Sequence, residues 1–487
     1  MSFTASICDA KKQADEASGK LRKFLELSEE LRRDLGVPGV GLAIVYDNEV
    51  IYVGGLGYQD VERQIPVTEN SLFSIGSNTK GFTGVLAAKL VSRGLLEWDA
   101  PLIGYVPEFK LKEEYLTRNA TVADSLAHRV GVERKSELWK YKTLTRQDLL
   151  GKLEQLHCDH GFRTGFNYSN LMYMVVGVAQ ERVTGDSWEE LIQKEILGPL
   201  GMKDSVTTTE AFLKSENRAI GYRGDGMRPA PPVDLTAIAP AGAIGSTPKD
   251  VSRWIKMIVN NGQHEGESFL TQEENDYLFR PHKSLSIRNG DELWFYYAGI
   301  GGFVKNGKRN IGANGGIDGQ NSRCVLLPDD GFGIFVMTNQ VSGYKELIAT
   351  YAEQIFVDGR LRRDFEREKQ LASDAAFQRL WTYLEDHGAG VAQTEYAKME
   401  FKPNENSMNQ LGYQLMQSGQ LNQAMVVFEL NVIGFPESAN AHDSLAESMM
   451  NSKNYEAANR HYRKSLELDP SNANAKAMLE KIEELSK

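Results

Sequence analysis

The chain has 487 residues, of which 41% are hydrophobic and 25% are charged, as expected of a folded protein with two or three domains. Its 66 acidic residues outnumber its 55 basic residues, and the net charge of −11 argues against a general affinity for nucleic acid or anionic membranes. An apolar run long enough for a membrane span and a secretion-signal pattern are both missing, and the three cysteines are widely separated. We therefore expect a cytoplasmic protein.

Residues 10–35 carry a charged, amphipathic pattern that predicts a helix. The apolar runs 41–46 and 50–53 flank Asp47-Asn48 and predict a β-hairpin. Further strand-like runs come at 293–300, 322–327 and 333–337, and helical segments alternate with glycine-rich loops between 80 and 265. Strands at both ends with helices between them favour an α/β fold of the α+β type, with one antiparallel sheet closed by both termini.

The most informative segment is Ser77-Asn78-Thr79-Lys80, which leads into an apolar helical stretch at 85–96. A serine and a lysine three residues apart share one face of a helix, with Cβ atoms about 5–6 Å apart. A serine hydroxyl needs an adjacent base to become a nucleophile, and a lysine amine serves only if burial or neighbours lower its pKa. We therefore predict Ser77 as the nucleophile and Lys80 as its base.

The same S-x-x-K spacing also occurs at Ser246 and Ser342. Ser246 is interpreted as a helix start, because Pro248 and Asp250 follow it as in the first turn of a helix. Ser342 follows an apolar strand and is expected in a loop that leads into a helix. Only Ser77 stands between an extended segment and a long apolar helix; the alternative is that it merely caps that helix.

Tyr168-Ser169-Asn170 precedes another apolar helical segment. A lysine cation nearby lowers the pKa of a tyrosine, so we expect Tyr168 to accept and return a proton. Asn170 offers an amide for Lys80 and for a substrate carbonyl, or is only a helix N-cap. His157-Cys158-Asp159-His160 looks like a metal cluster, but four adjacent residues do not all converge on one ion. We expect a polar loop there, and neither a metal nor a cofactor.

Ser77-x-x-Lys80 and Tyr168-x-Asn170, in this order, resemble the penicillin-binding-protein-like serine hydrolases close to class C β-lactamases. The blocks 125–131, 196–202 and 240–244 fit as well, and the resemblance covers about residues 35–356. It implies a β-lactamase/transpeptidase-like antiparallel sheet flanked by helices, an all-helical subdomain and an active site between them. It also implies an oxyanion hole formed by the backbone amides of Ser77 and Gly316.

The third element of this family, K-T-G or H-x-G on a strand facing the nucleophile, corresponds here to residues 312–319. Ala313 stands where the family has lysine or histidine. A substrate carboxylate thereby loses a main partner, which lowers the expectation of a true β-lactamase or carboxypeptidase. Asn314 is expected to supply a neutral hydrogen bond to the substrate instead.

A pattern of small, aromatic and proline residues recurs after 34 residues near the C-terminus: Gly412, Ala424, Phe428 and Pro436 return as Ala446, Ala458, Tyr462 and Pro470. It resembles the tetratricopeptide repeat, with unrelated helical hairpins as the alternative. Two repeats are fewer than the three usually needed for stability, so we expect them to dock on the helices at 359–404 or on the catalytic body. We predict a hydrolase domain at 1–358 with a helical insert at about 100–235, a helical connector at 359–404, and repeats at 405–487 ending in a capping helix at 473–486.

These features predict a serine hydrolase that forms an acyl-enzyme on Ser77 and cleaves an ester or amide, as an esterase, a D-amino-acid amidase or peptidase, or a weak β-lactamase. The expected substrate is a small molecule or short peptide, and residues 405–487 could bind a protein partner. Two alternatives stay open. One is an acyltransferase that uses the same acyl-enzyme; the other is a non-catalytic scaffold that binds partners through the repeats.

Overall fold

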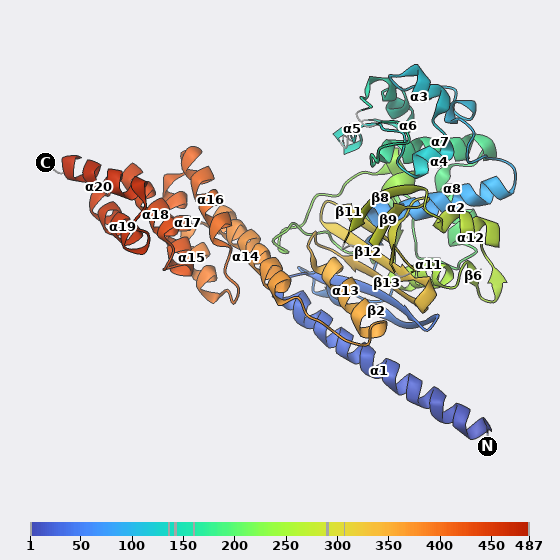
Figure 1. Cartoon of the computed structure of the whole chain (residues 1–487), viewed down its shortest axis with the longest axis horizontal. Coiled ribbons are helices and arrows are strands. Elements are labelled where there is room, and N and C mark those ends of the chain that lie inside the picture. The colour runs from blue at the N-terminus through green and yellow to red at the C-terminus, as the bar shows by residue number, and fades with distance from the viewer. Residues whose placement is uncertain are drawn as a thin grey trace. The chain divides into compact units, whose positions relative to one another are not determined.

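The computed structural model describes residues 2–134, 137–140, 144–158, 161–288, 292–305 and 307–485. The chain divides into two compact units (Figure 1). The first comprises Met1–Arg33, Val37–Arg223 and Met227–Arg363, and the second comprises Asp34–Gly36, Gly224–Gly226 and Asp364–Lys487. The functional division at residues 358 and 404 stays a prediction.

A nine-stranded sheet lies at the centre of the first unit, in the order β3-β2-β1-β13-β12-β11-β10-β9-β8, and each pair of neighbours is antiparallel. The N-terminal hairpin joins the C-terminal strands where β1 pairs with β13. This confirms the predicted α/β fold with a sheet closed by both ends. The strands are β1 Gly39–Tyr46, β2 Glu49–Asp60, β3 Ile65–Pro66, β8 Lys283–Arg288, β9 Glu292–Tyr296, β10 Gly301–Lys305, β11 Lys308–Ile317, β12 Gln320–Leu327 and β13 Phe332–Thr338.

Local features of the sequence explain which strands could be predicted and which could not. Asp47 and Asn48 have φ values of +53° and +63°, as the tight turn of the predicted hairpin requires. The run predicted at 293–300 ends as a strand at Tyr296, because Tyr297 N then donates to Ile300 O in a turn. β10 and β11 were not predicted, because their glycines provide no side chains for an alternating pattern. β8 was not predicted either.

Helices cover both faces of the sheet. The ring of Phe332 stacks on Phe356 of α13, whereas a Cβ at the next residue, Gly333, would contact Val259 of α11. Because neighbouring residues of a strand point to opposite faces, α13 and α11 lie on opposite sides. The helices of this unit are α1 Ser2–Asp34, α2 Thr79–Ser92, α3 Glu114–Asn119, α4 Val122–Leu126, α5 Glu137–Lys140, α6 Arg146–Leu150, α7 Asn170–Thr184, α8 Trp188–Ile192, α9 Thr209–Lys214, α10 Ala239–Gly242, α11 Pro248–Val259, α12 Gln272–Phe279 and α13 Tyr344–Phe356.

Short elements complete the first unit: the paired strands β4 Phe73–Ser74 with β5 Gly245–Ser246 and β6 Gln263–His264 with β7 Glu267–Ser268, the 3-10 turns η1 Gly76–Asn78, η2 Leu102–Gly104, η3 Leu153–Gln155, η5 Thr236–Ile238 and η6 Pro328–Asp330, and the π-helical turn η4 Gln193–Leu197. The predicted helix at 10–35 is confirmed by α1. The interpretation of Ser246 as a helix start is wrong by one residue: Thr247 is the N-cap of α11, and Ser246 is the buried end of β5. Ser342 lies just before α13, as predicted.

The second unit is built from the helices α14 Phe365–His387, α15 Ala389–Lys398, α16 Glu405–Gln417, α17 Leu421–Gly434, α18 Ala439–Asn451, α19 Tyr455–Leu468 and α20 Ala473–Leu485. A Cβ added at Gly412 would lie 2.4 Å from the Phe428 ring, so the missing side chain lets α16 and α17 approach closely. Leu380 and Tyr396 share one apolar core with both repeats, so of the two predicted docking sites the repeats pack on the helices at 359–404, and α20 confirms the capping helix. Among the described helices, none combines the length and apolarity that crossing a bilayer requires.

Candidate active site

Ser77 lies in the 3-10 turn η1, immediately before the buried helix α2. Backbone pairing holds the segment before it, because Ile75 N donates to Ile244 O at 3.0 Å. Behind the turn, Asn78 Nδ2 donates to Ser322 Oγ at 2.8 Å. The apolar segment predicted at 85–96 is helical as far as Ser92. Ser77 itself keeps part of its surface exposed, so its hydroxyl is accessible to a ligand.

Lys80 is completely buried on the first turn of α2. Its Nζ lies 3.2 Å from Ser77 Oγ, 2.8 Å from Asn170 Oδ1 and 2.8 Å from the carbonyl oxygen of Ala241. Burial lowers the pKa of this amine well below its ordinary value, and the charge of Arg134 lowers it further. The structure thus brings three of the predicted residues together and provides the lowered pKa that a lysine base needs.

The three neighbours of Nζ orient an uncharged amine. A neutral amine has two N–H donors and one lone pair, whereas an ammonium has three donors. The carbonyl oxygen of Ala241 and Asn170 Oδ1 only accept, so they take the two donors. In a neutral amine the lone pair is left for the remaining neighbour, Ser77, whose hydroxyl can then donate to it; from an ammonium the same oxygen accepts at 3.2 Å.

Asn170 is the first residue of α7 and does not cap this helix. Ser169 is the N-cap, because its side chain accepts from Met172 N. The alternative interpretation of Asn170 as a mere cap is therefore wrong. Since Asn170 Oδ1 accepts from Lys80, the NH₂ group of the same amide points elsewhere and can donate to another group.

Tyr168 lies beside the same pair. Lys80 Nζ is 4.8 Å from the centre of its ring. Burial raises the pKa of Tyr168 to about 12, and this outweighs its hydrogen bond with Ser77 and the charge of Arg134, which both lower it. The expectation of a lowered pKa is wrong, because burial of the phenol outweighs the influences that lower its pKa. Tyr168 rests as a phenol that can donate a proton.

His128 holds Tyr168 in place. Ser169 N donates to His128 Nδ1 at 3.1 Å, so the proton of the neutral ring is on Nε2, which donates to Tyr296 Oη at 3.2 Å. Burial lowers the pKa of His128 well below 6.5, in keeping with this neutral form. The rings of His128 and Tyr168 have centres 4.3 Å apart. His128 therefore positions Tyr168 through ring packing and the following backbone.

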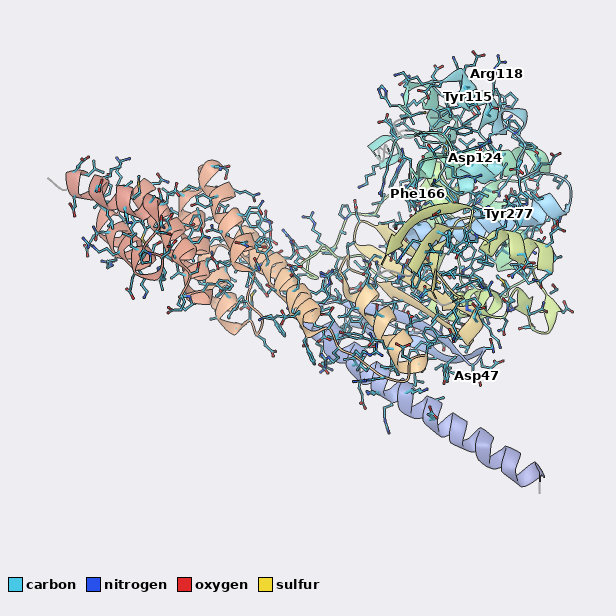
Figure 2. The ribbon with its side chains drawn as sticks, in the orientation of Figure 1. Asp47, Tyr115, Arg118, Asp124, Phe166 and Tyr277 are labelled. Carbon is cyan, nitrogen blue, oxygen red and sulfur yellow. The ribbon has the colours of Figure 1, made fainter. Side chains whose placement is uncertain are left out.

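The loop that carries Tyr168 is fixed by a buried carboxylate, Asp124, which is labelled together with Phe166 in Figure 2. Arg163 Nη2 and Arg129 Nη2 approach the two oxygens of Asp124 at 2.8 and 2.9 Å. The backbone adds two bonds, from Arg163 N to Arg129 O at 2.8 Å and from Asn167 N to His128 O at 2.9 Å. Paired, hydrogen-bonded charges of this kind define the path of the loop.

Strand β11 approaches the Ser77 turn backbone to backbone. A Cβ at Gly315 would lie 1.9 Å from Ile75 O, and a Cβ at Gly76 would lie 2.6 Å from Gly316 N. Gly76 also has φ +51°, which favours glycine. Only glycine at these two positions allows the two backbones to come this close. The Gly316 amide therefore lies next to the Ser77 turn, at the place of the predicted oxyanion hole.

Asn314 occupies the opposite side of β11 from Gly315. Its Oδ1 accepts from Lys345 Nζ at 3.0 Å, and it pairs across the sheet with Arg323. Ala313 shares the side of Gly315, facing the nucleophile, and supplies only a methyl group there. The sequence did not reveal Arg134, Arg323 or the Ala241 carbonyl. Lys345 was visible only as the lysine of the third S-x-x-K copy.

A cavity of about 550 Å³ connects these groups, with Ser77, Tyr168, Asn314 and Gly316 in its wall, whereas Lys80 lies behind it. No cluster of three metal-ligating side chains exists among the described residues. Asp159 and His160, from the sequence that looked like a metal cluster, lie outside them.

Two family models match the chain. One described as Beta-lactamase covers residues 24–355, and one described as Tetratricopeptide repeat covers residues 439–472. Among curated proteins, Protein flp of Staphylococcus aureus (strain MW2) is 29% identical over 320 residues, which is 63% of this chain and 61% of that protein. The Unguisins hydrolase ungD of Aspergillus violaceofuscus is 26% identical over 331 residues, 62% of this chain and 58% of that protein. The chain thus spans less than two thirds of these relatives.

Solved structures agree with the fold. The octameric penicillin-binding protein homologue from Pyrococcus abyssi superposes with a TM-score of 0.62 and 26% identity, over 74% of this chain and 81% of that one. The D-amino acid amidase from Ochrobactrum anthropi SV3 superposes with a TM-score of 0.56 over 67% of this chain and 96% of that one. At 22% identity the second likeness concerns the fold alone.

Proposed function

The chain belongs to the β-lactamase family of serine hydrolases, and we propose that it forms an acyl-enzyme on Ser77 and cleaves an ester or amide. One observation carries the proposal: Ser77 Oγ lies 3.2 Å from the amine of the buried Lys80, whose two donors already have acceptors. A hydroxyl in a solvent-accessible cavity next to the lone pair of a base is an activated nucleophile.

In the first step Lys80 accepts the proton of Ser77 as Oγ attacks the substrate carbonyl. The developing oxyanion is negative, and the amides of Ser77 and Gly316 are the proposed donors to it. Asn170 supports the step in two ways: its oxygen fixes the amine, and its NH₂ group is available to a substrate carbonyl. No metal is needed for these transfers.

The leaving group then needs a proton, and Tyr168 is proposed to deliver it. Before the reaction its pKa is raised to about 12, so its hydroxyl carries a proton. Once Lys80 is protonated, an ammonium lies 4.8 Å from the Tyr168 ring and favours loss of that proton. Tyr168 can therefore donate to the leaving group and recover a proton from Lys80, and water releases the acyl group by the reverse path.

The C-terminal repeats are proposed to bind a protein partner while residues 1–358 carry out hydrolysis. The proposal rests on the repeat match at 439–472 and on the helical pairs α16–α17 and α18–α19. Tetratricopeptide-like helix pairs stack into extended surfaces that suit protein ligands. An esterase, an amidase or peptidase, and a weak β-lactamase are the candidate activities, to be separated with a substrate panel.

The test replaces Ser77 by alanine. We expect the Ser77→Ala protein to lose both fluorophosphonate labelling and hydrolysis of 4-nitrophenyl butyrate. The matched control is Ser342→Ala, since Ser342 has the same S-x-x-K spacing but lies before α13. Unchanged hydrolysis in Ser77→Ala would overturn the proposal, and an unlabelled wild-type Ser77 would favour a scaffold. Ester or amide products formed from added alcohols or amines would identify an acyltransferase.

A further inference from the structure

The cations in the wall of the nucleophile's cavity lie in two different places. The described wall contains Arg134, Arg323 and Lys345 and neither aspartate nor glutamate. Arg323 pairs across the sheet with Asn314, and Lys345 donates to the same side chain, so both lie on the side of β11 that faces away from the nucleophile. Arg134 comes instead from the loop that follows α4, and its surroundings are those of the proton-transfer residues.

Arg134 lies against the ring of Tyr168. Its guanidinium carbon is 5.4 Å from the ring centre, within the distance of about 6 Å at which a ring face attracts a cation. Lys80 Nζ lies 4.8 Å from the same centre, and the phenol of this ring is hydrogen-bonded with Ser77. A fixed positive charge thus adjoins the ring that connects the base with the nucleophile.

Backbone pairing brings Arg134 to this place, although its own side chain is exposed. Val132 pairs with Cys158 in an isolated β-bridge. Glu133 N donates to His157 O at 2.9 Å, and His157 N donates to Glu133 Oε1 at 2.9 Å. The His157-Cys158 segment, which looked like part of a metal cluster in the sequence, therefore holds the loop that carries Arg134.

The loop of Arg134 and the loop of Tyr168 are also bonded to each other. Asn167 Nδ2 donates to Gly131 O at 3.2 Å, and Asn167 N donates to His128 O at 2.9 Å. The two loops are thus joined just before Arg134 and just before Tyr168. The guanidinium is therefore kept beside the ring by the backbone, and the contact does not depend on the long arginine side chain alone.

Among the described residues, the guanidinium of Arg134 is the charged group that acts on Lys80 and Tyr168, and it lowers the pKa of both. The other titratable side chains against this pair are uncharged, because burial lowers the pKa of the imidazole well below 6.5 and raises the pKa of both phenols well above 10; they are His128, Tyr173 and Tyr296. Their contacts with the pair are ring contacts and do not supply a charge.

We propose that Arg134 controls the proton at this site: its charge keeps Lys80 unprotonated before the attack and stabilises the phenolate of Tyr168 when the leaving group takes the phenol proton. The inference rests on the acyl-enzyme function proposed above and adds a positioning residue to it. Arg134 acts through the other two side chains and does not itself have to touch the substrate.

The proton steps balance as follows. The Ser77 proton passes to the Lys80 nitrogen as Oγ bonds to the substrate carbon, and the Tyr168 proton passes to the leaving group as the bond to that group breaks. The Lys80 ammonium then returns its proton to the Tyr168 phenolate. A positive charge beside the ring disfavours an ammonium before the attack and favours the phenolate that donation leaves. The same charge makes Lys80 a weaker base, so its benefit lies at pH values where an unassisted amine would be protonated.

The pH dependence of kcat/KM tests the assignment, with 4-nitrophenyl butyrate as an uncharged substrate that an arginine does not attract. Arg134→Gln removes the charge, so more of the Lys80 amine binds a proton. We expect the acid limb of the profile to move to higher pH, and the rate on this limb to fall by about three- to tenfold, the size of a partly screened charge interaction. Arg134→Lys keeps the charge and should restore the wild-type limb.

The matched control is Arg323→Gln, which removes a guanidinium from the same cavity but from the other side of β11. Its acid limb should stay at the wild-type pH. An unmoved limb in Arg134→Gln, or a loss of rate that is equal at every pH and is not restored by Arg134→Lys, would overturn the proposal. An equal shift in Arg134→Gln and Arg323→Gln would also contradict it, because the total charge of the cavity would then matter and the position beside Tyr168 would not.

A stability measurement separates this inference from the proposed function, because it needs no turnover. The pKa of Lys80 is lowered in the folded protein, so the unfolding free energy rises with pH above that folded pKa, relative to Lys80→Met. Removal of the Arg134 charge raises the folded pKa. Thermal melts from pH 5 to pH 10, with and without Lys80→Met, should therefore show that the rise begins at higher pH in Arg134→Gln than in the wild-type background.

The two proposals then fail in different ways. If Ser77→Ala still hydrolyses the ester but the onset of the rise moves with Arg134, the nucleophile is wrong and the role of Arg134 stands. If fluorophosphonate labels wild-type Ser77 but Arg134→Gln moves neither the onset nor the acid limb, the hydrolase proposal survives and the role of Arg134 is rejected.

Discussion

Lys80 is a lysine whose burial in the fold favours the neutral amine, which can act as a base. Its amine is enclosed, and among the described residues the charge that acts on it is that of the repelling Arg134, so burial and charge both favour the uncharged form. The two acceptors at 2.8 Å then fix the direction of the lone pair. Burial thus selects the protonation state, and hydrogen bonding selects the orientation.

Replacement of Lys80 by methionine should lower kcat by about 10²–10⁴, the usual effect of losing a general base. In the wild-type protein kcat/KM should rise with pH as Lys80 loses its proton, below the ordinary lysine pKa of 10.5. A pH–rate series with 4-nitrophenyl butyrate measures both effects. A change in KM alone would contradict the base assignment.

The same substitution changes how stability depends on pH. The folded pKa of Lys80 is lowered, so between that pKa and the unfolded pKa near 10.4 only the unfolded chain binds the proton. The unfolding free energy of the wild-type protein should therefore rise with pH in this range, by up to about 1.4 kcal/mol per pH unit relative to Lys80→Met. Thermal melts of both proteins at pH 7 and pH 9 test the sign.

Tyr168→Phe should affect poor leaving groups most. The phenol is proposed to protonate the departing atom, which an alkoxide or amide nitrogen needs and a nitrophenolate hardly does. We expect kcat to fall by about 10²-fold or more with an anilide and much less with 4-nitrophenyl butyrate. Equal losses on the two substrates would indicate that Tyr168 only shapes the cavity.

At the residue scale, the sequence predicted which residues lie close together where spacing carries the information. Lys80 lies within hydrogen-bonding distance of Ser77 and of Asn170, as S-x-x-K and Y-x-N indicated, and Tyr168 lies beside it. The predicted direction of the Tyr168 pKa shift was wrong, because the shift depends on burial, which spacing does not reveal. The Ala241 carbonyl was missed because every residue has one, and a backbone acceptor leaves no trace in the side-chain pattern.

Strand β11 shows a limit of sequence interpretation at the scale of elements. Its segment from 312 to 316 contains three glycines, which argue against a strand by propensity. In the folded protein the glycines are needed in this strand, because the strand contacts the Ser77 turn with no side chains between the two backbones. By contrast, the N-terminal hairpin was predictable because its turn residues and alternating strands are local signals.

Gly315→Ala should separate β11 from the Ser77 turn. The new Cβ would lie 1.9 Å from the backbone oxygen of Ile75, and a backbone cannot yield as a flexible side chain does. We expect at least a tenfold slower fluorophosphonate labelling and a loss of about 1–3 kcal/mol in stability. Gly104→Ala is the matched control, because no atom lies within 4 Å of its Cβ position. Wild-type labelling in Gly315→Ala would contradict the close approach.

At the scale of the whole chain, the length indicated two or three domains without fixing the number, whereas the helical class of the C-terminal part followed from the period of 34 residues. The sheet and the helical repeats are where those patterns placed them. The patterns left open whether the repeats pack on α14 and α15 or on the catalytic body, and they did not show that residues 224–226 group with the second unit. Such grouping depends on packing between distant segments.

Phe428→Ala should destabilise the second unit by about 3–5 kcal/mol, because a fully buried ring on Gly412 is lost. Ester hydrolysis at Ser77 should persist at temperatures where hydrogen exchange shows residues 405–487 opening. Ile433→Ala, in the same helix with its side chain 66% exposed, is the control and should change little. Simultaneous loss of hydrolysis would mean that the two units unfold together.

Three cationic side chains, those of Arg134, Arg323 and Lys345, line the Ser77 cavity and affect the encounter with substrate. Because the pKa of the reacting amine is lowered, these three are the positive charges that the described wall of the cavity presents to an anion. In an otherwise acidic molecule these charges focus the field at one opening, and a Debye length of about 8 Å at physiological ionic strength confines it there. Added salt should therefore slow the capture of an anionic substrate without changing the rate at which a captured one reacts.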